Sequence, residues 1–175
     1  MAVVAGDAIK YKLDKSKFQG LFLPTDAPAL ENIGWVHSNM WDGRTNSDPG
    51  FHTPDLPKPL HVSIDMGTAD YPLYSFRLWQ RTDWDTAYGH GNPKTFALWG
   101  SNDPAPDGSW NSWTKLGDFT SETHELSAGE LFEMPPGTPA FRYLRIQVLS
   151  TWGYGTEVGP VVMMEIEVMG NFVAK

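Results

Sequence analysis

The 175-residue chain has no cysteine, which excludes disulfides, thiolate metal sites and thiol nucleophiles together. It also has no run of basic residues. Its 13 Lys and Arg stand against 21 Asp and Glu, so the formal net charge is −8. Such a chain repels a phosphate backbone or an anionic membrane surface, and we therefore expect no nucleic acid as a partner.

Long apolar stretches are missing as well. No segment approaches the ~18–20 consecutive apolar residues of a membrane-spanning helix. Residues 1–12 lack the basic start and the apolar centre of a signal peptide. We expect no membrane insertion, and an origin as one domain of a secreted or surface-anchored parent stays open.

The helical period is also absent, since no stretch of 12 or more residues repeats its apolar positions every 3.6 residues. Apolar and polar residues instead alternate with a period of two, which is typical of strands with one buried face. This alternation occurs in residues 60–66, 74–79, 95–99, 143–148 and 162–168. Turn clusters rich in Gly and Pro, such as 89–93 and 135–137, separate these segments. The pattern predicts an all-β sandwich or barrel.

The length of the chain favours one domain, because domains cluster near ~100–150 residues. We expect residues 1–34 to form an N-terminal extension with the first strand or strands of the sandwich. Residues 35–175 then supply the rest of the same domain.

Aromatic residues make up 13% of the chain and fall into two groups. Those in the alternating segments, such as Phe76 and Phe96, are expected in the core or on a sheet face. The others gather in two loops, residues 81–94 and 150–156, together with polar neighbours. The candidate binding residues of these loops are Arg81, Trp84, Tyr88, His90, Asn92, Trp152 and Tyr154. A tryptophan in such a turn either folds back as a plug or receives a ligand, and both alternatives stay open for each one.

Two aromatic loops in one chain favour a ligand, and their composition favours a sugar. A sugar ring has an apolar C–H face that stacks on an aromatic plane, while its hydroxyls need polar side chains nearby. We therefore predict a non-catalytic carbohydrate-binding module whose loop aromatics stack on a glycan and whose Arg, His and Asn bind its hydroxyls. An aromatic platform for single-stranded nucleic acid needs a basic groove, which this acidic chain does not offer.

Enzyme motifs are absent from the sequence. It contains no GxSxG, P-loop, GxGxxG or HExxH pattern, and its five histidines lack metal-ligand spacing. A glycosidase needs two carboxylates placed in space, so Asp83 with Asp85 or Glu165 with Glu167 keeps that alternative open. We expect the simpler explanations of these pairs, which are loop solvation for the first and a solvent-facing strand edge for the second. We expect no enzyme, and the main alternative to glycan binding is a structural or protein-docking domain of a larger cell-surface protein.

Five segments in a fixed order carry a family resemblance. They are WDG at 41–43, LHVSIDMG at 60–67, FALWGSND at 96–103 with WTKLG at 113–117, FRYLRI at 141–146 and MEIEVMG at 164–170. Over about residues 35–170 the chain resembles the discoidin, or coagulation factor V/VIII type C, family. Residues 77–103 are similar to discoidin-like domains at the C-terminus of surface lipoproteins in bacterial polysaccharide-uptake systems. The resemblance implies an antiparallel eight-stranded jelly-roll β-sandwich, glycan binding by loops at one end and an extracytoplasmic location.

The resemblance also implies a structural Ca²⁺ ion. Many discoidin-like carbohydrate-binding modules hold one in the turn that Asp42 matches, closed by the acidic residue near the last strand, here Glu165. Arg44, however, stands where a second acid is common. Asn46 and Asp48 offer oxygen ligands that would complete the site. Alternatively, Arg44 replaces the cation with a guanidinium–carboxylate pair.

Overall fold

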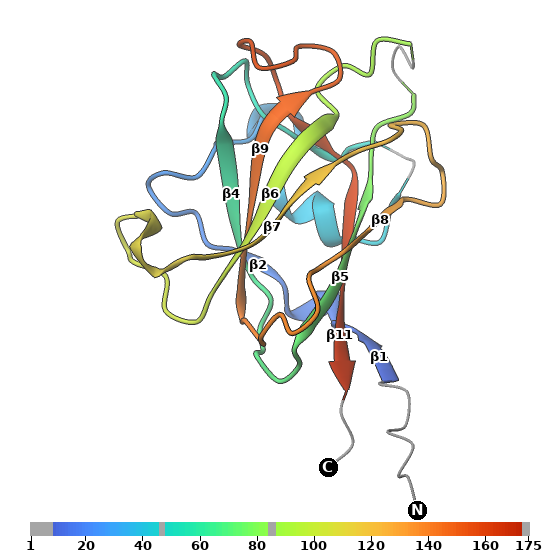
Figure 1. The fold of residues 1–175 in the computed structure, drawn as a ribbon. Coiled ribbons are helices and arrows are strands. Elements are labelled where there is room, and N and C mark those ends of the chain that lie inside the picture. The colour runs from blue at the N-terminus through green and yellow to red at the C-terminus, as the bar shows by residue number, and fades with distance from the viewer. Residues whose placement is uncertain (1–8, 46–47, 84–86, 173–175) are drawn as a thin grey trace, which may run out of the picture.

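The computed structural model describes residues 9–45, 48–83 and 87–172, which form a β-sandwich (Figure 1). One sheet has the spatial order β1 (Ile9–Lys12), β11 (Glu165–Phe172), β5 (Leu73–Trp79) and β8 (Glu130–Glu133). The other has the order β2 (Gln19–Gly20), β4 (Leu60–Asp65), β9 (Tyr143–Thr151), β6 (Pro93–Ser101) and β7 (Thr114–Thr120). A separate pair joins β10 (Val162–Met163) to β3 (Phe51–His52). Each of these pairings is antiparallel.

The predicted antiparallel sandwich is confirmed. Within the described residues, eight strands have four or more residues, and three further strands have two residues each. Each alternating segment of the sequence forms a strand, and the last one is divided between β10 and β11 at Met164. Four short 3-10 helices were not predicted: η1 (Lys15–Lys17), η2 (Glu31–Ile33), η3 (His37–Trp41) and η4 (Trp110–Ser112).

The apolar core lies between the two main sheets. Val62 and Ile64 of β4 share one buried cluster with Val168 of β11, and each is at most 1% exposed. The rings of Phe76 on β5 and Phe96 on β6 join the sheets, with their centroids 5.9 Å apart. Complete burial of such a side chain stabilises the fold by about 1.5–3 kcal/mol.

The segment before residue 35 is part of the same sandwich. Strand β1 pairs with β11 in one sheet, and β2 pairs with β4 in the other. Leu13, Phe18 and Ala27 belong to the core cluster that the later strands form. These residues therefore close the sandwich instead of folding as a separate unit.

The outer face of β4 and β9 is covered, which the alternating pattern did not predict. Arg145 of β9 is 0% exposed, and its guanidinium carbon lies 4.5 Å from the Trp110 ring centroid and 4.2 Å from that of Trp113. Its Nε donates to Ser63 Oγ at 2.8 Å. His61 and Ser63, the polar residues of an apparently one-faced strand, are consequently buried as well.

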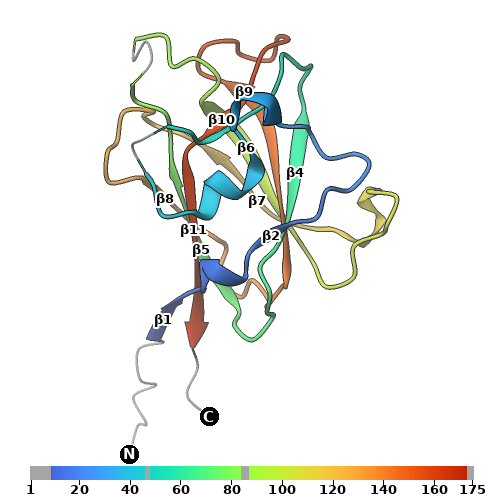
Figure 2. The same ribbon diagram turned by 180° about the vertical axis from the view of Figure 1, so that it is seen from behind.

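The loops that matter for function gather at one end of the sandwich. The β5–β6, β9–β10 and β3–β4 connections meet at the end drawn uppermost in Figures 1 and 2. The start of β1 and the end of β11 lie side by side at the opposite end. In the described part of the chain, no helix has the length and apolar character needed to cross a membrane.

Candidate functional site

Backbone hydrogen bonds join the two loops that the sequence singled out. The Trp152 N–H donates to the Asn92 carbonyl at 2.9 Å, and the Gly153 N–H donates to the His90 carbonyl at 2.8 Å. The Val162 N–H, just beyond the second loop, donates to the Gly91 carbonyl at 2.9 Å. The two loops are thus held in a fixed relative position, as a binding surface requires.

Asn92 has a positioning role in this arrangement. It is 1% exposed, its Nδ2 donates to the Arg81 carbonyl at 2.8 Å, and its Oδ1 accepts from the Arg81 N–H at 3.0 Å. The amide therefore extends the backbone pairing beyond the end of β5. The structure places Asn92 beneath the surface, so its predicted contact with sugar hydroxyls is replaced by a contact that fixes Arg81.

Arg81 lies across a tryptophan that the sequence analysis did not select. Its guanidinium carbon is 4.7 Å from the Trp35 ring centroid, and its Nε donates to Asp83 Oδ1 at 2.7 Å. This hydrogen bond lowers the pKa of the Asp83 carboxyl. With its side chain 11% exposed, Arg81 offers only the rim of its guanidinium to a ligand.

Four aromatic side chains form a continuous row at the loop end. This loop-end row consists of His52, His90, Tyr154 and Tyr88. Nε2 of His52 lies 3.3 Å from Nε2 of His90, whose ring centroid is 5.8 Å from that of Tyr154. The Tyr154 and Tyr88 centroids are 5.5 Å apart in an edge-to-face arrangement. Tyr88 is 40% exposed and the other three residues are partly exposed, so the row presents ring surface to solvent.

The pKa values of His52, His90 and Tyr154 are shifted toward their uncharged forms. Burial lowers the pKa values of His52 and His90, so both imidazoles are neutral near pH 7. The hydrogen bond with Tyr88 raises the pKa of the Tyr154 hydroxyl to about 12. Neutral imidazole and phenol groups each donate and accept hydrogen bonds, which matches the dual character of sugar hydroxyls.

Trp152 packs inward, which corresponds to the plug alternative. Its ring centroid lies 4.8 Å from that of His124, and Lys94 Nζ is 4.7 Å from the Trp152 ring. A Cβ atom added at Gly89, where φ is +73°, would come within 2.5 Å of the Trp152 Cβ. The indole Nε1 of Trp152 is buried and has no hydrogen-bond partner among the described residues. Trp84, the other tryptophan of the prediction, lies outside the described residues.

Sequence reasoning missed several residues of this end, notably Trp35, His52 and Lys58. Lys58 Nζ donates to the Gly159 carbonyl at 2.8 Å and lies 5.8 Å from the Tyr154 ring centroid. His52 reaches His90 because β3 pairs with β10, a contact between segments 110 residues apart (His52 with Val162). No local spacing in the sequence signals such a pairing.

The predicted Ca²⁺ ligands bind basic groups in this structure. Glu165 is 0% exposed, and its carboxylate pairs with the Lys15 ammonium and accepts from the Gly43 N–H at 3.1 Å. Asp42 Oδ2 receives both Nε and a terminal nitrogen of Arg44, at 2.8 and 2.7 Å.

Asp48, another predicted ligand, does not complete a cation site. The Asp48 carboxylate is half exposed and lies 4.0 Å from Arg81, while Asn46 is outside the described residues. No group of three or more His, Asp or Glu able to hold a metal ion occurs among the residues that the structure describes. The described donors do not fit Ca²⁺, because an ammonium and a guanidinium take up the carboxylate oxygens. Binding of Ca²⁺ in solution stays an untested prediction.

Comparison with known proteins identifies the family of this chain. Residues 41–170 match the profile of DUF5000, a family described as a domain of unknown function. The chain belongs to this family. No curated protein matches this DUF5000 chain significantly.

Solved structures place the DUF5000 chain among discoidin-like domains. The SusE-like protein BT2857 is 29% identical with a TM-score of 0.80, over 94% of this chain and 68% of that protein. A family 32 carbohydrate-binding module, CBM32-3 of a Clostridium perfringens glycoside hydrolase, superposes with a TM-score of 0.68 at 18% identity, over 91% and 95% of the two chains. The family 32 module of C. perfringens NanJ, solved in complex with galactose, has a TM-score of 0.66 at 19% identity, over 92% and 99%. The resemblance predicted from the sequence is confirmed at the level of the fold.

Proposed function

We propose that this chain is a non-catalytic carbohydrate-binding module of a larger cell-surface protein and that it holds a glycan on the loop-end row. The observation that carries the proposal is the row itself. Partly exposed rings from strand β3 and from the β5–β6 and β9–β10 loops lie in contact, and backbone hydrogen bonds join the two loops to each other. Such a preformed surface binds a ligand without a large ordering cost.

Each member of the row has a definite task in this proposal. The rings of Tyr88 and Tyr154 receive the apolar face of a sugar, since their hydroxyls are already engaged with each other. The neutral imidazole of His90 faces the sugar hydroxyls. His52 holds the His90 ring in place, since its Nδ1 donates to the Thr53 carbonyl at 2.7 Å and its Nε2 lies 3.3 Å from His90 Nε2. Arg81 adds donors at the rim, on the side where Trp35 supports it.

The contacts of the carboxylate pairs considered for a glycosidase favour a binding role over a catalytic one. Glu165 is buried against Lys15, and Glu167 forms an ion pair with Lys12 at 2.8 Å, so neither faces an open site as a free acid. Asp83 is held by Arg81, and Asp85 lies outside the described residues. A glycosidase requires two carboxyl groups facing one sugar ring across a gap, which the Glu165 and Glu167 pair does not provide.

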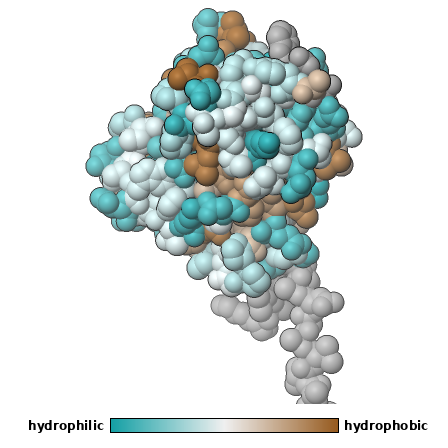
Figure 3. Space-filling model, turned by 45° about the horizontal axis from the view of Figure 1, so that its top comes forward, coloured by the Kyte–Doolittle hydropathy of each residue, from teal (hydrophilic) through white to brown (hydrophobic). Residues whose placement is uncertain are grey.

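The surface of the loop end supports a glycan ahead of a docked protein. Figure 3, in which this end is tilted toward the viewer, shows hydrophilic and intermediate residues there, with hydrophobic ones in separate small areas. A protein-docking face is expected to contain a continuous apolar centre. The family 32 modules with the same fold add support for sugar binding, and the SusE-like relative supports a cell-surface location.

A glycan array probed with the whole chain, with and without EDTA, tests the proposal. We expect binding to a defined group of glycans, unchanged by the chelator. The proposal fails if no glycan is retained while the chain self-associates or binds other domains of its parent protein. That result would establish the docking alternative.

A further inference from the structure

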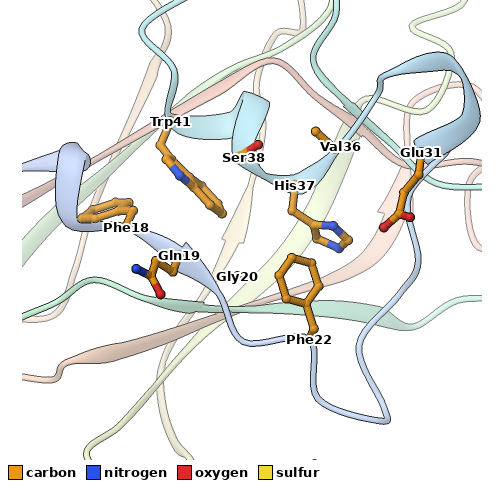
Figure 4. Close-up of a pocket in the computed structure, with 9 residues that line it drawn as sticks. All are labelled: Phe18, Gln19, Gly20, Phe22, Glu31, Val36, His37, Ser38 and Trp41. Atoms are coloured by element: carbon orange, nitrogen blue, oxygen red, sulfur yellow. The ribbon is translucent and has the colours of Figure 1, made fainter.

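A second hollow lies on the flank of the sandwich, away from the loop-end row. Residues 18–22, around β2, form one wall, and residues 31–41, which include η2 and η3, form the other (Figures 2 and 4). We propose that this groove, the flank groove, is a separate binding site for an uncharged pyranose sugar. Its volume of about 330 Å³ is at the lower limit of the ~300–1,000 Å³ typical of ligand pockets, which suits one sugar ring.

Phe22 is held at the mouth of the groove in a strained and exposed position. Its φ is +51°, in a region that non-glycine residues rarely adopt, and it is 64% exposed. The residues on both sides are anchored: the Leu21 N–H donates to the Ser63 carbonyl at 3.0 Å, and the Leu23 N–H donates to Asp26 Oδ2 at 2.9 Å. The backbone on both sides of Phe22 thus holds its aromatic ring at the mouth of the groove, where a bound sugar would pack against it.

The aromatic lining continues from Phe22 into the groove. The His37 ring centroid lies 5.0 Å from that of Phe22 in an edge-to-face contact, and Trp41 meets Phe18 at 6.2 Å (Figure 4). A Cβ atom at Gly20 would come within 2.7 Å of the Phe22 ring, so this ring lies directly against the β2 backbone. The groove therefore offers apolar ring surfaces of the kind that stack on sugar C–H groups.

The polar side chains of the lining are available for hydrogen bonding. Gln19, Glu31 and Ser38 line the groove, and their side chains form no hydrogen bond or ion pair with other described residues. His37 Nε2 lies 3.0 Å from the Ala27 carbonyl, which can only accept, so Nε2 carries the proton. Because burial lowers its pKa, this imidazole is neutral, and Nδ1 remains an acceptor for a sugar hydroxyl.

The charge of the lining selects among sugars. Glu31 is its one charged residue, and no Lys or Arg contributes to the groove. A uronic or sialic acid would therefore meet an uncompensated carboxylate, whereas a neutral sugar can donate hydroxyl protons to it. This selectivity distinguishes the flank groove from the loop end, where Arg81 and Lys58 stand beside the rings.

The two sites share no lining side chain. Trp35 belongs to the loop end, where it lies against Arg81 and His52. His37, two residues later in the chain, contacts Phe22 in the flank groove. The flank groove is thus an addition to the proposed function and does not depend on it. Two sites in one module would raise the avidity for a polysaccharide without stronger binding at either.

NMR titration of the whole ¹⁵N-labelled chain tests the flank groove. The probes are the methyl pyranosides of glucose, galactose, mannose and N-acetylglucosamine, with glucuronate as the anionic comparison. We expect the signals of Phe22, His37 and Ser38 to shift with at least one neutral sugar. Phe22→Ala should weaken this binding about fivefold, the worth of one aromatic face. Leu131→Ala, which removes another side chain that is 44% exposed, should leave it unchanged.

Further variants separate the two sites. Tyr154→Ala should not alter the groove titration, and Glu31→Gln should narrow the preference for neutral sugar over glucuronate by about threefold. The groove proposal is overturned if none of the four neutral sugars moves its signals, or if Phe22→Ala binds as the parent does. Shifts confined to the loop end would retain the proposed function and remove the groove. Shifts confined to the groove would retain the groove as a sugar site and would count against the loop-end row.

Discussion

Lys15 illustrates how single residues compensate buried charge in this domain. Its ammonium reaches the fully buried Glu165 carboxylate from η1, at the position where the sequence resemblance led us to expect Ca²⁺. The neighbouring Asp42 is neutralised in the same way by Arg44. The sequence analysis offered an Arg44 guanidinium–carboxylate pair as the alternative to Ca²⁺, and this pair is what Asp42 forms. The role of Lys15 was not predicted, because Lys15 lies 150 residues from Glu165 in the chain.

Replacing Lys15 should therefore be costly. Lys15→Met leaves a buried carboxylate without its counter-ion, and we expect a loss of about 3 kcal/mol in the free energy of unfolding at pH 7.5, measured with urea. Lys12→Met is the matched control, because Lys12 is 60% exposed in its pair with Glu167 and should cost less than about 1 kcal/mol. The double variant Lys15→Met/Glu165→Gln should recover most of the loss.

EDTA provides the complementary measurement for the same position. If Lys15 supplies the positive charge, the chelator should leave the unfolding midpoint of the parent chain unchanged. A clear drop in the midpoint on addition of EDTA, reversed by Ca²⁺, would show that a cation is bound and would refute the assignment to Lys15.

His61 should produce a pH dependence of stability. Burial, together with the charge of Arg145, lowers its pKa from 6.5 to about 4. Between pH 6.5 and 4, the unfolded state binds a proton at His61 that the folded state does not. The contribution of neutral His61 to the free energy of unfolding is therefore complete above pH 6.5 and is lost as the pH falls toward 4. The shift corresponds to a loss on the order of 3 kcal/mol at about 1.4 kcal/mol per pKa unit.

Urea unfolding at several pH values tests this expectation. His61→Gln should gain stability relative to the parent chain as the pH falls from 6.5 to 4, because glutamine does not titrate, whereas the raised pKa of Glu165 acts equally in both chains. An equal decline in the parent chain and in the variant would show that other groups cause it.

At the scale of elements, alternation identified the long strands that have one face on the core. Strand β8 has four residues, and β2, β3 and β10 have two each, too few to establish a period. Strand β7 is largely exposed along its length, so its apolar residues are sparse. The 3-10 helices have three to five residues and likewise carry no helical period. Three of these short elements, β2, η2 and η3, build the flank groove, which explains why the sequence did not reveal it.

Asn92 links two elements, and its removal should loosen the end of β5. Asn92→Ala leaves the Arg81 N–H and carbonyl without their buried partners, and we expect a loss of about 1–3 kcal/mol with faster amide exchange at Arg81. Asn102→Ala is the matched control, since Asn102 bridges backbone groups in the same manner at an exposed position. Equal costs for both variants, or unchanged exchange at Arg81, would contradict the positioning role of Asn92.

At the scale of the whole molecule, the sequence singled out the two loops of the proposed binding end but not all the residues that meet there. The two loops that the sequence singled out are in contact through backbone hydrogen bonds of His90, Trp152 and Gly153, and their role as the site stays a prediction. Tyr88, His90 and Tyr154 belong to the loop-end row, whereas Asn92 and Trp152 serve its support. Trp35 and His52 enter from earlier parts of the chain through long-range pairing, which no local pattern encodes.

Affinity electrophoresis through a gel containing a polysaccharide that the chain binds tests the central claim most directly. Tyr154→Ala and His90→Ala should abolish retention with little change in melting temperature. Tyr11→Ala, which removes a tyrosine that is 42% exposed on β1 at the opposite end, should be retained like the parent. Unaltered retention of both loop-end variants, with both correctly folded, would contradict glycan binding by the loop-end row.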